Sequence, residues 1–553
     1  MTPDQLRELV GAGESLTTEF KSDPINDTDL VEAVVCLANA SGGFLLIGIG
    51  DDGSSRGLQG PDSNRADPVR VRALVEHRTE PHIRVGVEVV THGPTQVTVI
   101  TVPQATTVVA TTGGKYLRRT IDVRGEPQCL PMRPNEVFSR AGDLGVLDFT
   151  AASLPEATRD DLSEAELSRF RELAAGQGDA ALSGLSATDL LRALNLENPD
   201  GHINIGAVLL FGTESALARL VPAYELAFQV LDRLEVRHNE IGRKPLLAAM
   251  EFLTDRIEAH NPEEELQQGL LRIGLPRFAR VAVRELVANA LVHRDYTSLG
   301  MTIAQIDGDG LSIANPGGFP EGLSTSNVLV AAPKHRNPLL ANAFQRAGVV
   351  ERTGRGINRV FVSQLSIGHP APDYSASTST SVTALLRSGP ADLELAGYIA
   401  EARMSGEELD LDALLVLHEV RNERRITSAR AAELLQITPE AARSALNHLV
   451  GSGMLEARGE RKARTYHLSA GLYRRLGRAT EYVRTRGFDA LQQEQMVLTY
   501  VSRHGAITRR EAAQLCQLSP EQAGRLLRRL RDERKLEQIG ERRHARYVEP
   551  GQA

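Results

Sequence analysis

At 553 residues the chain is too long for one ordinary domain, and domain sizes predict roughly three or four. Its composition, 41% hydrophobic and 24% charged, excludes a disordered chain, and no apolar run approaches the roughly 20 residues that span a bilayer. The net charge of −8 is distributed unevenly along the chain. Residues 401–553 contain 27 Lys and Arg against 21 Asp and Glu, whereas residues 1–400 contain 36 against 50. A nucleic-acid-binding surface is therefore expected in the last part of the chain.

The first residues have neither the basic nor the apolar region of an export signal, so we expect a cytoplasmic protein without a membrane partner. The three cysteines show no CxxC or Cys/His spacing. This argues against zinc fingers and against a disulfide framework.

Near the start, the pattern E-S-x3-E-F-K spans residues 14–21 and precedes a helix predicted over 29–39. The pattern A-N-x2-G-G follows from Ala38, and then an apolar strand is predicted over 44–49. Asp51 comes directly after that strand, so several carboxylates lie at the ends of elements.

This combination resembles the Schlafen AlbA-type domain, which implies an α+β fold over residues 1–145. In nuclease members of that family, two glutamates and an aspartate bind a divalent metal and cut RNA. The resemblance assigns these roles to Glu14, Glu19 and Asp51 with Mg²⁺ or Mn²⁺, and Lys21 would neutralise phosphate; clustered carboxylates suit such hard cations. The alternative is a structural or regulatory acidic pattern, since Gly50 stands where many members have an acidic residue.

The middle of the chain, residues 146–395, is predicted to be an α/β domain. Helices are expected around 162–194 and over 245–257, and strands in the apolar runs 201–212 and 224–234. Further on, Glu285, Asn289 and His293 recur every four residues, which places all three on one face of a helix.

That helix resembles the N-box of gyrase and histidine-kinase type ATPases in a divergent form. The resemblance implies that Glu285 activates water and that Asn289 holds Mg²⁺ with ATP. Asn315 replaces the aspartate that reads adenine in the classical fold. The remaining cofactor-binding candidates are His293, Gly317, Gly354 and Gly356, the last two in a T-G-R-G turn that can present backbone N–H groups to phosphate. The alternative is an ATPase fold retained only for dimerisation.

The last part contains an internal repeat. Residues 426–466 overlay residues 507–547 without a gap and share 17 of 41 positions. In each copy a helix (411–420; 495–502) leads to Ile-Thr, and Thr427 or Thr508 is suited to cap the next helix. Pro439 or Pro520 then begins a further helix, which is followed by two short strands. The pattern predicts two winged helix-turn-helix modules, rich in α-helix, over residues 405–475 and 485–553.

The second helix of each pair is the predicted recognition helix, and a basic turn forms each wing. Residue types that read base edges or clamp phosphates follow on exposed positions of these segments. The candidates in copy one are Arg443, Ser444, Asn447, His448, Arg461 and Lys462, and those in copy two are Gln522, Arg525, Arg528, Arg529, Arg542 and Arg543. Winged helices also serve as dimerisation or docking modules, which is the alternative.

Two functions are therefore open. The first is a DNA-binding transcriptional regulator, modulated by nucleotide and expected to form a homo-oligomer. The second is a Schlafen-like metal-dependent endoribonuclease that cuts tRNA or other RNA in phage defence.

Overall fold

The computed structural model describes the chain except for residues 51, 59–63, 123, 234, 269–270, 321, 351–354, 460–463, 477–489, 517, 541–544 and 551–553. The chain divides into two compact units. Unit 1 comprises Met1–Pro262, Phe278–Val360 and Pro372–Gly389, and unit 2 comprises Glu263–Arg277, Phe361–Ala371 and Pro390–Ala553. None of the helices in the described ranges is long and apolar enough to cross a membrane.

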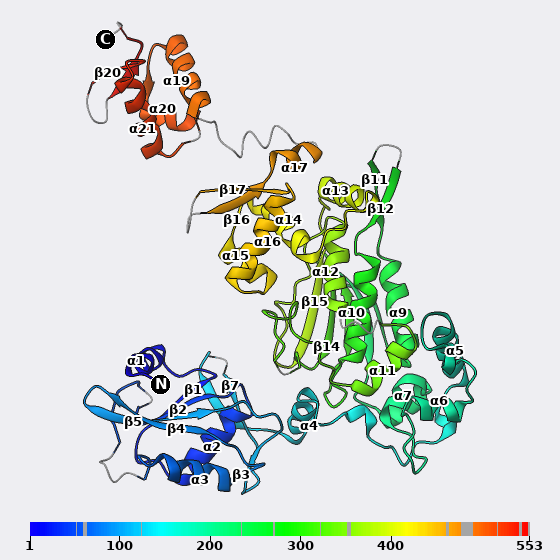
Figure 1. Ribbon diagram of the computed structural model, residues 1–553. Coiled ribbons are helices and arrows are strands. Elements are labelled where there is room, and N and C mark those ends of the chain that lie inside the picture. The colour runs from blue at the N-terminus through cyan, green and yellow to red at the C-terminus, as the bar shows by residue number, and fades with distance from the viewer. Residues whose placement is uncertain are drawn as a thin grey trace. The chain divides into compact units, whose positions relative to one another are not determined.

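Unit 1 begins with a four-stranded sheet in the order β1-β2-β5-β4 (Figure 1). Its strands are β1 (Thr18–Lys21), β2 (Gly43–Ile47), β4 (Gly86–His92) and β5 (Thr95–Val102). Strands β1 and β2 are parallel, and the other neighbours are antiparallel. The accompanying elements are α1 (Pro3–Ala12), α2 (Asp27–Ala38), α3 (Pro68–Arg78), β3 (Thr79–Glu80), β6 (Ala110–Thr111), β7 (Leu117–Ile121), β8 (Pro127–Pro131) and α4 (Pro134–Asp143).

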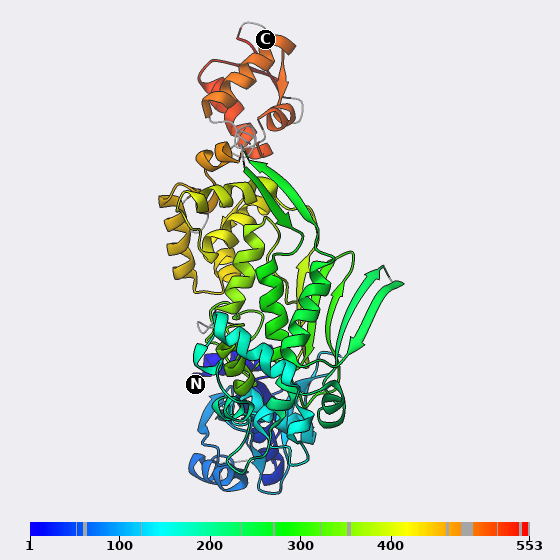
Figure 2. The ribbon, with the colours of Figure 1, turned by 90° about the vertical axis from the view of Figure 1, so that its right-hand side faces the viewer.

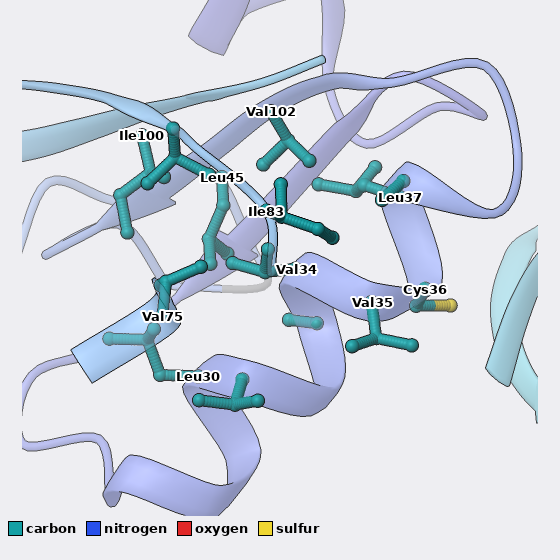
Figure 3. Packing of buried hydrophobic residues seen from close by; sticks show 14 of the residues in the cluster. Leu30, Val34, Val35, Cys36, Leu37, Leu45, Val75, Ile83, Ile100 and Val102 are labelled. Carbon is teal, nitrogen blue, oxygen red and sulfur yellow. The ribbon is translucent and has the colours of Figure 1, made fainter. Parts of the chain in front are cut away.

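Both faces of this sheet are covered, because successive side chains of a strand point to opposite faces. Leu45 of β2 packs into one cluster with α2 and α3 (Figure 3), and Ile47 belongs to the same cluster. Leu46 joins a second cluster with Leu6 of α1 and Phe20. The alternation explains why β2 reads as a continuous apolar run, and the predicted helix and strand at 29–39 and 44–49 are confirmed within two residues at each end.

The prediction that the cysteines form no disulfide is wrong. Cys36 on α2 and Cys129 on β8 are joined by a disulfide, with their Cα atoms 6.0 Å apart. The two residues are 93 positions apart in sequence, and only the packing of α2 against the β7–β8 hairpin brings them together. Spacing along the chain carries no signal for such a pair. The third cysteine, Cys516, is a buried free thiol.

The middle of unit 1 contains a five-stranded sheet in the order β10-β9-β13-β14-β15. Its strands are β9 (Leu226–Asp232), β10 (Glu235–Gly242), β13 (Thr302–Ile306), β14 (Gly310–Pro316) and β15 (Ser381–Arg387). Only β9 and β13 are parallel. Helices α9 (Leu246–Glu258) and α10 (Arg280–Val292) pack on this sheet (Figures 1 and 2). Strand β9 and helix α9 confirm the predictions for 224–234 and 245–257.

Residues 201–212, predicted to be a strand, form a helix instead. Helix α7 (Ile205–Phe211) is capped by Asn204, whose side chain accepts the N–H of Ala207, and all seven helical residues are buried. A short run that is apolar on every side has no period, so periodicity cannot separate a buried helix from a buried strand. The neighbouring helices are α5 (Glu164–Gln177), α6 (Ala187–Ala193), α8 (Glu214–Leu220), α11 (Pro338–Arg346) and α12 (Gly356–Ser366), the last of which continues into unit 2.

Unit 2 contains the hairpin of β11 (Glu263–Gln268) and β12 (Leu271–Pro276), helix α13 (Leu393–Met404) and both copies of the repeat. Copy one comprises α14 (Leu411–Glu423), β16 (Ile426–Thr427), α15 (Ser428–Leu435), α16 (Pro439–Gly451), β17 (Leu455–Arg458) and β18 (Thr465–Leu468), followed by α17 (Ala470–Arg475). Copy two comprises α19 (Ala490–His504), β19 (Ile507–Thr508), α20 (Arg509–Leu515), α21 (Pro520–Asp532), β20 (Glu537–Ile539) and β21 (Arg546–Val548).

The two copies have the same element order and the same three-stranded antiparallel sheet, β16-β18-β17 and β19-β21-β20. The predicted caps are confirmed, since Thr427 and Thr508 accept N–H groups at the starts of α15 and α20. Thr438 and Ser519 cap α16 and α21 in the same way.

Candidate functional site

A cavity of about 430 Å³ lies in unit 1 among α10, the ends of β14 and β15, the segment after β14 and the first turn of α12. Most of the residues that line it are apolar, as in most small-molecule sites. The polar groups that line it come from separate elements, and they include Glu285, Asn289, His293, Asn315 and Arg355. The cavity therefore collects most of the residues predicted to bind nucleotide.

Glu285 and Asn289 line the cavity from α10, and most of the other residues of this helix are buried. The carboxylate of Glu285, whose side chain is 6% exposed, forms an ion pair with Arg359 of α12, with Nη1 to Oε1 at 2.9 Å. A β-carbon at Gly356 would lie 2.9 Å from the other carboxylate oxygen, so the first turn of α12 packs directly on Glu285. Arg359 was not among the predicted site residues, because it belongs to none of the motifs recognised in the sequence.

His293 ends α10 and stacks on His335, with ring centroids 5.2 Å apart and an angle of 13° between the rings. Burial, together with the positive charges that His335 and Arg336 can carry, lowers the pKa of His293 to about 3. Burial also lowers the pKa of His335. Both rings are therefore neutral at pH 7, and they form a flat wall at this end of the cavity.

Arg336, which is 4% exposed, holds the backbone beside the stacked rings in place. Its guanidinium donates to Asp143 of α4, through Nε at 2.8 Å and Nη2 at 2.5 Å, and to the carbonyls of His293 and Gly318 at 2.8 Å each. Arg336 was not among the predicted site residues, and its partner Asp143 lies 193 positions away in the sequence.

The predicted glycines divide among different roles. Gly317 is not among the cavity-lining residues. Its φ is +96°, and a β-carbon at this position would lie 2.3 Å from Nη1 of Arg336. Glycine is therefore needed here to leave space for that guanidinium. Gly356 does line the cavity. Gly354 lies outside the described residues. Asn315 lines the cavity, and its Nδ2 donates to the carbonyl of Pro316 at 3.3 Å.

The carboxylates of Glu14 and Glu19 already have partners within the protein. An oxygen of Glu14 accepts the backbone N–H of Phe20 at 2.7 Å. Glu19, 7% exposed, pairs with Lys21 at 2.5 Å and with the guanidinium of Arg119, which also donates to the carbonyls of Ser15 and Thr18. Burial lowers the pKa of Arg119, and the charge of Glu14 acts in the opposite direction.

These contacts do not fit a metal ion. Two cations neutralise Glu19, and across the described ranges no group of three or more His, Cys, Asp or Glu side chains is placed to hold a metal. Asp51, the third predicted ligand, lies outside the described residues. Arg119 was not predicted as part of this cluster.

In the repeat, the predicted contact residues of both second helices are exposed. These are Arg443, Ser444, Asn447 and His448 on α16, and Gln522, Arg525, Arg528 and Arg529 on α21. Arg529 is held by Glu494 at 3.5 Å and by Glu533 at 3.8 Å. The predicted wing residues Arg461, Lys462, Arg542 and Arg543 lie outside the described residues.

Comparisons with known families agree with the two resemblances drawn from the sequence. Residues 14–132 match the family model of the Schlafen AlbA_2 domain, and residues 304–386 match HATPase_c_4, described as "Putative ATP-dependent DNA helicase recG C-terminal". The chain thus contains a Schlafen AlbA_2 domain followed by an ATPase-like domain. Residues 143–227 match a domain of unknown function, DUF8451.

No curated protein matches the chain. Among solved structures, the crystal structure of the DIP2311 protein from Corynebacterium diphtheriae is 21% identical to it. The match covers 99% of this chain and 98% of that chain with a TM-score of 0.49.

Proposed function

We propose that this chain is a nucleic-acid-binding regulator that contacts duplex DNA through its C-terminal repeat and is modulated by a nucleotide bound in the α10 cavity. Each copy of the repeat follows the order helix, strand, helix, helix, strand, strand with one small antiparallel sheet. That order supports their assignment as winged helix-turn-helix modules, with α16 and α21 as the recognition helices.

The exposed face of α21 is the observation that carries the proposal. Ala523, Leu527 and Leu530 bury one side of the helix, and Arg525 and Arg528 lie on the exposed side. Lys and Arg on one helix face supply the charge that phosphate contacts require. Because Arg529 is held by two glutamates, we place the main phosphate contacts on Arg525 and Arg528.

Copy one presents a less basic face. Arg443 is the one basic residue among its four predicted contact residues, beside Ser444, Asn447 and His448. Asn447 is a side chain that can read adenine edges, and its Oδ1 lies 3.5 Å from the hydroxyl of Tyr466. This face suits base contacts or pairing between two chains, and light scattering of the purified protein tests the expected homo-oligomer.

The cavity supports the nucleotide part of the proposal. It offers an amide oxygen from Asn289, which is a hard oxygen donor that suits Mg²⁺ bound with ATP. When bound, Mg²⁺ would neutralise phosphate charge. Asn315 is the residue that we assign to the base, in the place of the family's aspartate.

The test is the salt dependence of duplex retention. We expect binding of labelled duplex DNA to weaken steeply with salt, and the Arg525→Gln/Arg528→Gln variant to lower the slope of log K against log salt by about 2. The matched control, Arg192→Gln/Arg237→Gln, removes two exposed arginines of the middle domain and should leave the slope unchanged. Absence of salt-sensitive retention by the unaltered chain would contradict the proposal.

Metal-dependent RNA cleavage is the second candidate, since the Schlafen AlbA_2 match covers Glu14 and Glu19. Their contacts with Phe20, Lys21 and Arg119 favour the regulator. Incubating tRNA with the chain and with a Glu19→Ala variant, in Mg²⁺ or Mn²⁺, separates the two. Intact RNA under every condition removes this candidate; cleavage by the unaltered chain alone would establish it.

A further inference from the structure

The ion pair between Glu285 and Arg359 bears on what happens to a bound nucleotide. Glu285 is the carboxylate that the ATPase resemblance assigns to water activation, and its side chain is 6% exposed. Arg359 contacts it at 2.9 Å from α12, a helix that follows α10 by more than sixty residues. The candidate base is thus held by a cation of the same chain.

Hydrolysis of a nucleoside triphosphate has a defined requirement for that base. Water adds its oxygen to the γ-phosphorus and gives up a proton, while the bond from that phosphorus to the bridging oxygen breaks and the diphosphate leaves with the electron pair. A general base must accept the proton of the attacking water. A carboxylate in a short ion pair is oriented toward its partner, and the nearby positive charge makes it a poorer proton acceptor.

The packing around Glu285 keeps the pair closed. The first turn of α12 lies directly on the carboxylate at Gly356, where no side chain intervenes. Arg359 lies one turn further along the same helix, so the same rigid element supplies both contacts. Opening the pair requires a shift of α12 or a change of rotamer at Glu285 or Arg359.

We infer that Arg359 is a positioning residue that restrains Glu285, so that the cavity retains an intact nucleoside triphosphate as a regulatory ligand instead of turning it over. This inference rests on the proposed nucleotide binding and does not depend on DNA binding. A retained triphosphate gives a regulator a stable bound state, whereas rapid hydrolysis would end that state after each binding event.

The experiment measures nucleotide affinity and turnover separately in the full chain. Affinity is measured with a fluorescent ATP analogue and Mg²⁺, and turnover by phosphate release from ATP. Unaltered protein should bind the analogue and release phosphate slowly. Arg359→Gln should raise phosphate release by about tenfold or more, within the range that a general base contributes, and leave the affinity within about threefold.

Three further variants make the result specific. Arg359→Lys keeps the positive charge and should stay slow. Glu285→Gln/Arg359→Gln should return to the slow rate, because the released base is gone. Arg171→Gln is the matched control: it removes an arginine from another partly buried pair, with Glu164, away from the cavity, and should change neither quantity.

Each outcome decides the inference. If Arg359→Gln binds the analogue but releases phosphate no faster, the restraint is overturned while nucleotide binding stands. If the variant folds but loses affinity by more than tenfold, Arg359 contacts phosphate and the inference is also overturned. If the unaltered chain binds no analogue, the proposed nucleotide binding itself fails. Should Arg359→Gln unfold, Arg359→Met, which keeps an unbranched apolar stem, takes its place.

Discussion

At the scale of single residues, the structure separates motif positions that hold the fold from those that reach the cavity. Asn39, from the A-N-x2-G-G pattern, is fully buried. Its side chain donates to the carbonyls of Val109 and Leu117 at 2.7 and 2.9 Å and accepts the N–H of Val109 at 2.9 Å. The asparagine thus joins the end of α2 to a segment 70 positions later, and its role is structural.

We therefore predict that Asn39→Ala lowers the free energy of unfolding by about 2–4 kcal/mol, since it leaves buried backbone groups without partners. Chemical unfolding followed by circular dichroism measures this. Asn135→Ala, at an exposed position of α4, is the matched control and should change the value by less than about 0.5 kcal/mol. Equal effects of the two substitutions would contradict the assignment.

The stacked histidines predict a pH dependence. The pKa of His293 is lowered to about 3 in the folded chain, whereas an unfolded histidine titrates near 6.5. Below about pH 6.5 the unfolded chain therefore binds a proton that the folded chain does not, so the free energy of unfolding falls as pH falls through this window. The contribution is at most about 1.4 kcal/mol per pH unit.

Replacing His293 by Gln should make this acid-side slope shallower by up to one proton. Urea unfolding at several pH values between 5 and 7.5 measures the slope. His202→Gln changes an exposed histidine and should leave it unaltered. An unchanged slope in His293→Gln would mean that another group dominates acid unfolding.

At the scale of elements, the repeat preserves backbone conformation while exchanging residues. At two pairs of equivalent positions with positive φ, one copy has arginine and the other has glycine. After the first helix, copy one has Arg424 at +64° and copy two has Gly505 at +80°. After α16 and α21 the order reverses, with Gly453 at +78° in copy one and Arg534 at +57° in copy two. Each copy thus carries one left-handed arginine where its twin has the glycine that this conformation favours.

This exchange predicts that Arg424→Gly and Arg534→Gly each stabilise their own module, by about 0.5–1 kcal/mol, because the left-handed conformation is strained for arginine. The reverse changes, Gly453→Arg and Gly505→Arg, should destabilise by a similar amount. Thermal unfolding of the four variants measures the effects. Destabilisation by Arg424→Gly would show instead that the arginine side chain supplies the dominant contact.

At the scale of the whole molecule, stability depends on contacts between distant parts of the chain. The Cys36–Cys129 disulfide closes a loop of 93 positions in the Schlafen AlbA_2 domain. We predict that the Cys36→Ser/Cys129→Ser variant unfolds with a free energy lower by about 2–4 kcal/mol than the oxidised chain.

Unfolding with and without reductant measures this effect, and mass spectrometry identifies the linked peptides. The double variant is its own control, because reductant should not alter it. Cys516 should react as a free thiol once the chain is unfolded. If the oxidised and reduced chains unfold alike, the disulfide does not form in solution.

Much of the fold was predictable from the sequence because it depends on neighbours along the chain. Helix caps, such as Thr508 and Ser519, act over three residues, and the polar residues of α10 recur with the period of a helix. The repeat likewise predicted the same order of elements twice, and both copies have it. The exception is α7, in which every residue is buried, so its apolar sequence shows no periodicity from which a helix could be predicted.

The candidate site was only half predictable. Helical spacing alone predicted that Glu285 and Asn289 share one face of α10, and both line the cavity. The ion pairs depend on the three-dimensional fold: Arg359 pairs with Glu285, Arg119 with Glu19, and Arg336 with a residue 193 positions earlier. Ion pairs form between whichever charges the fold brings together, and that proximity follows no spacing along the chain.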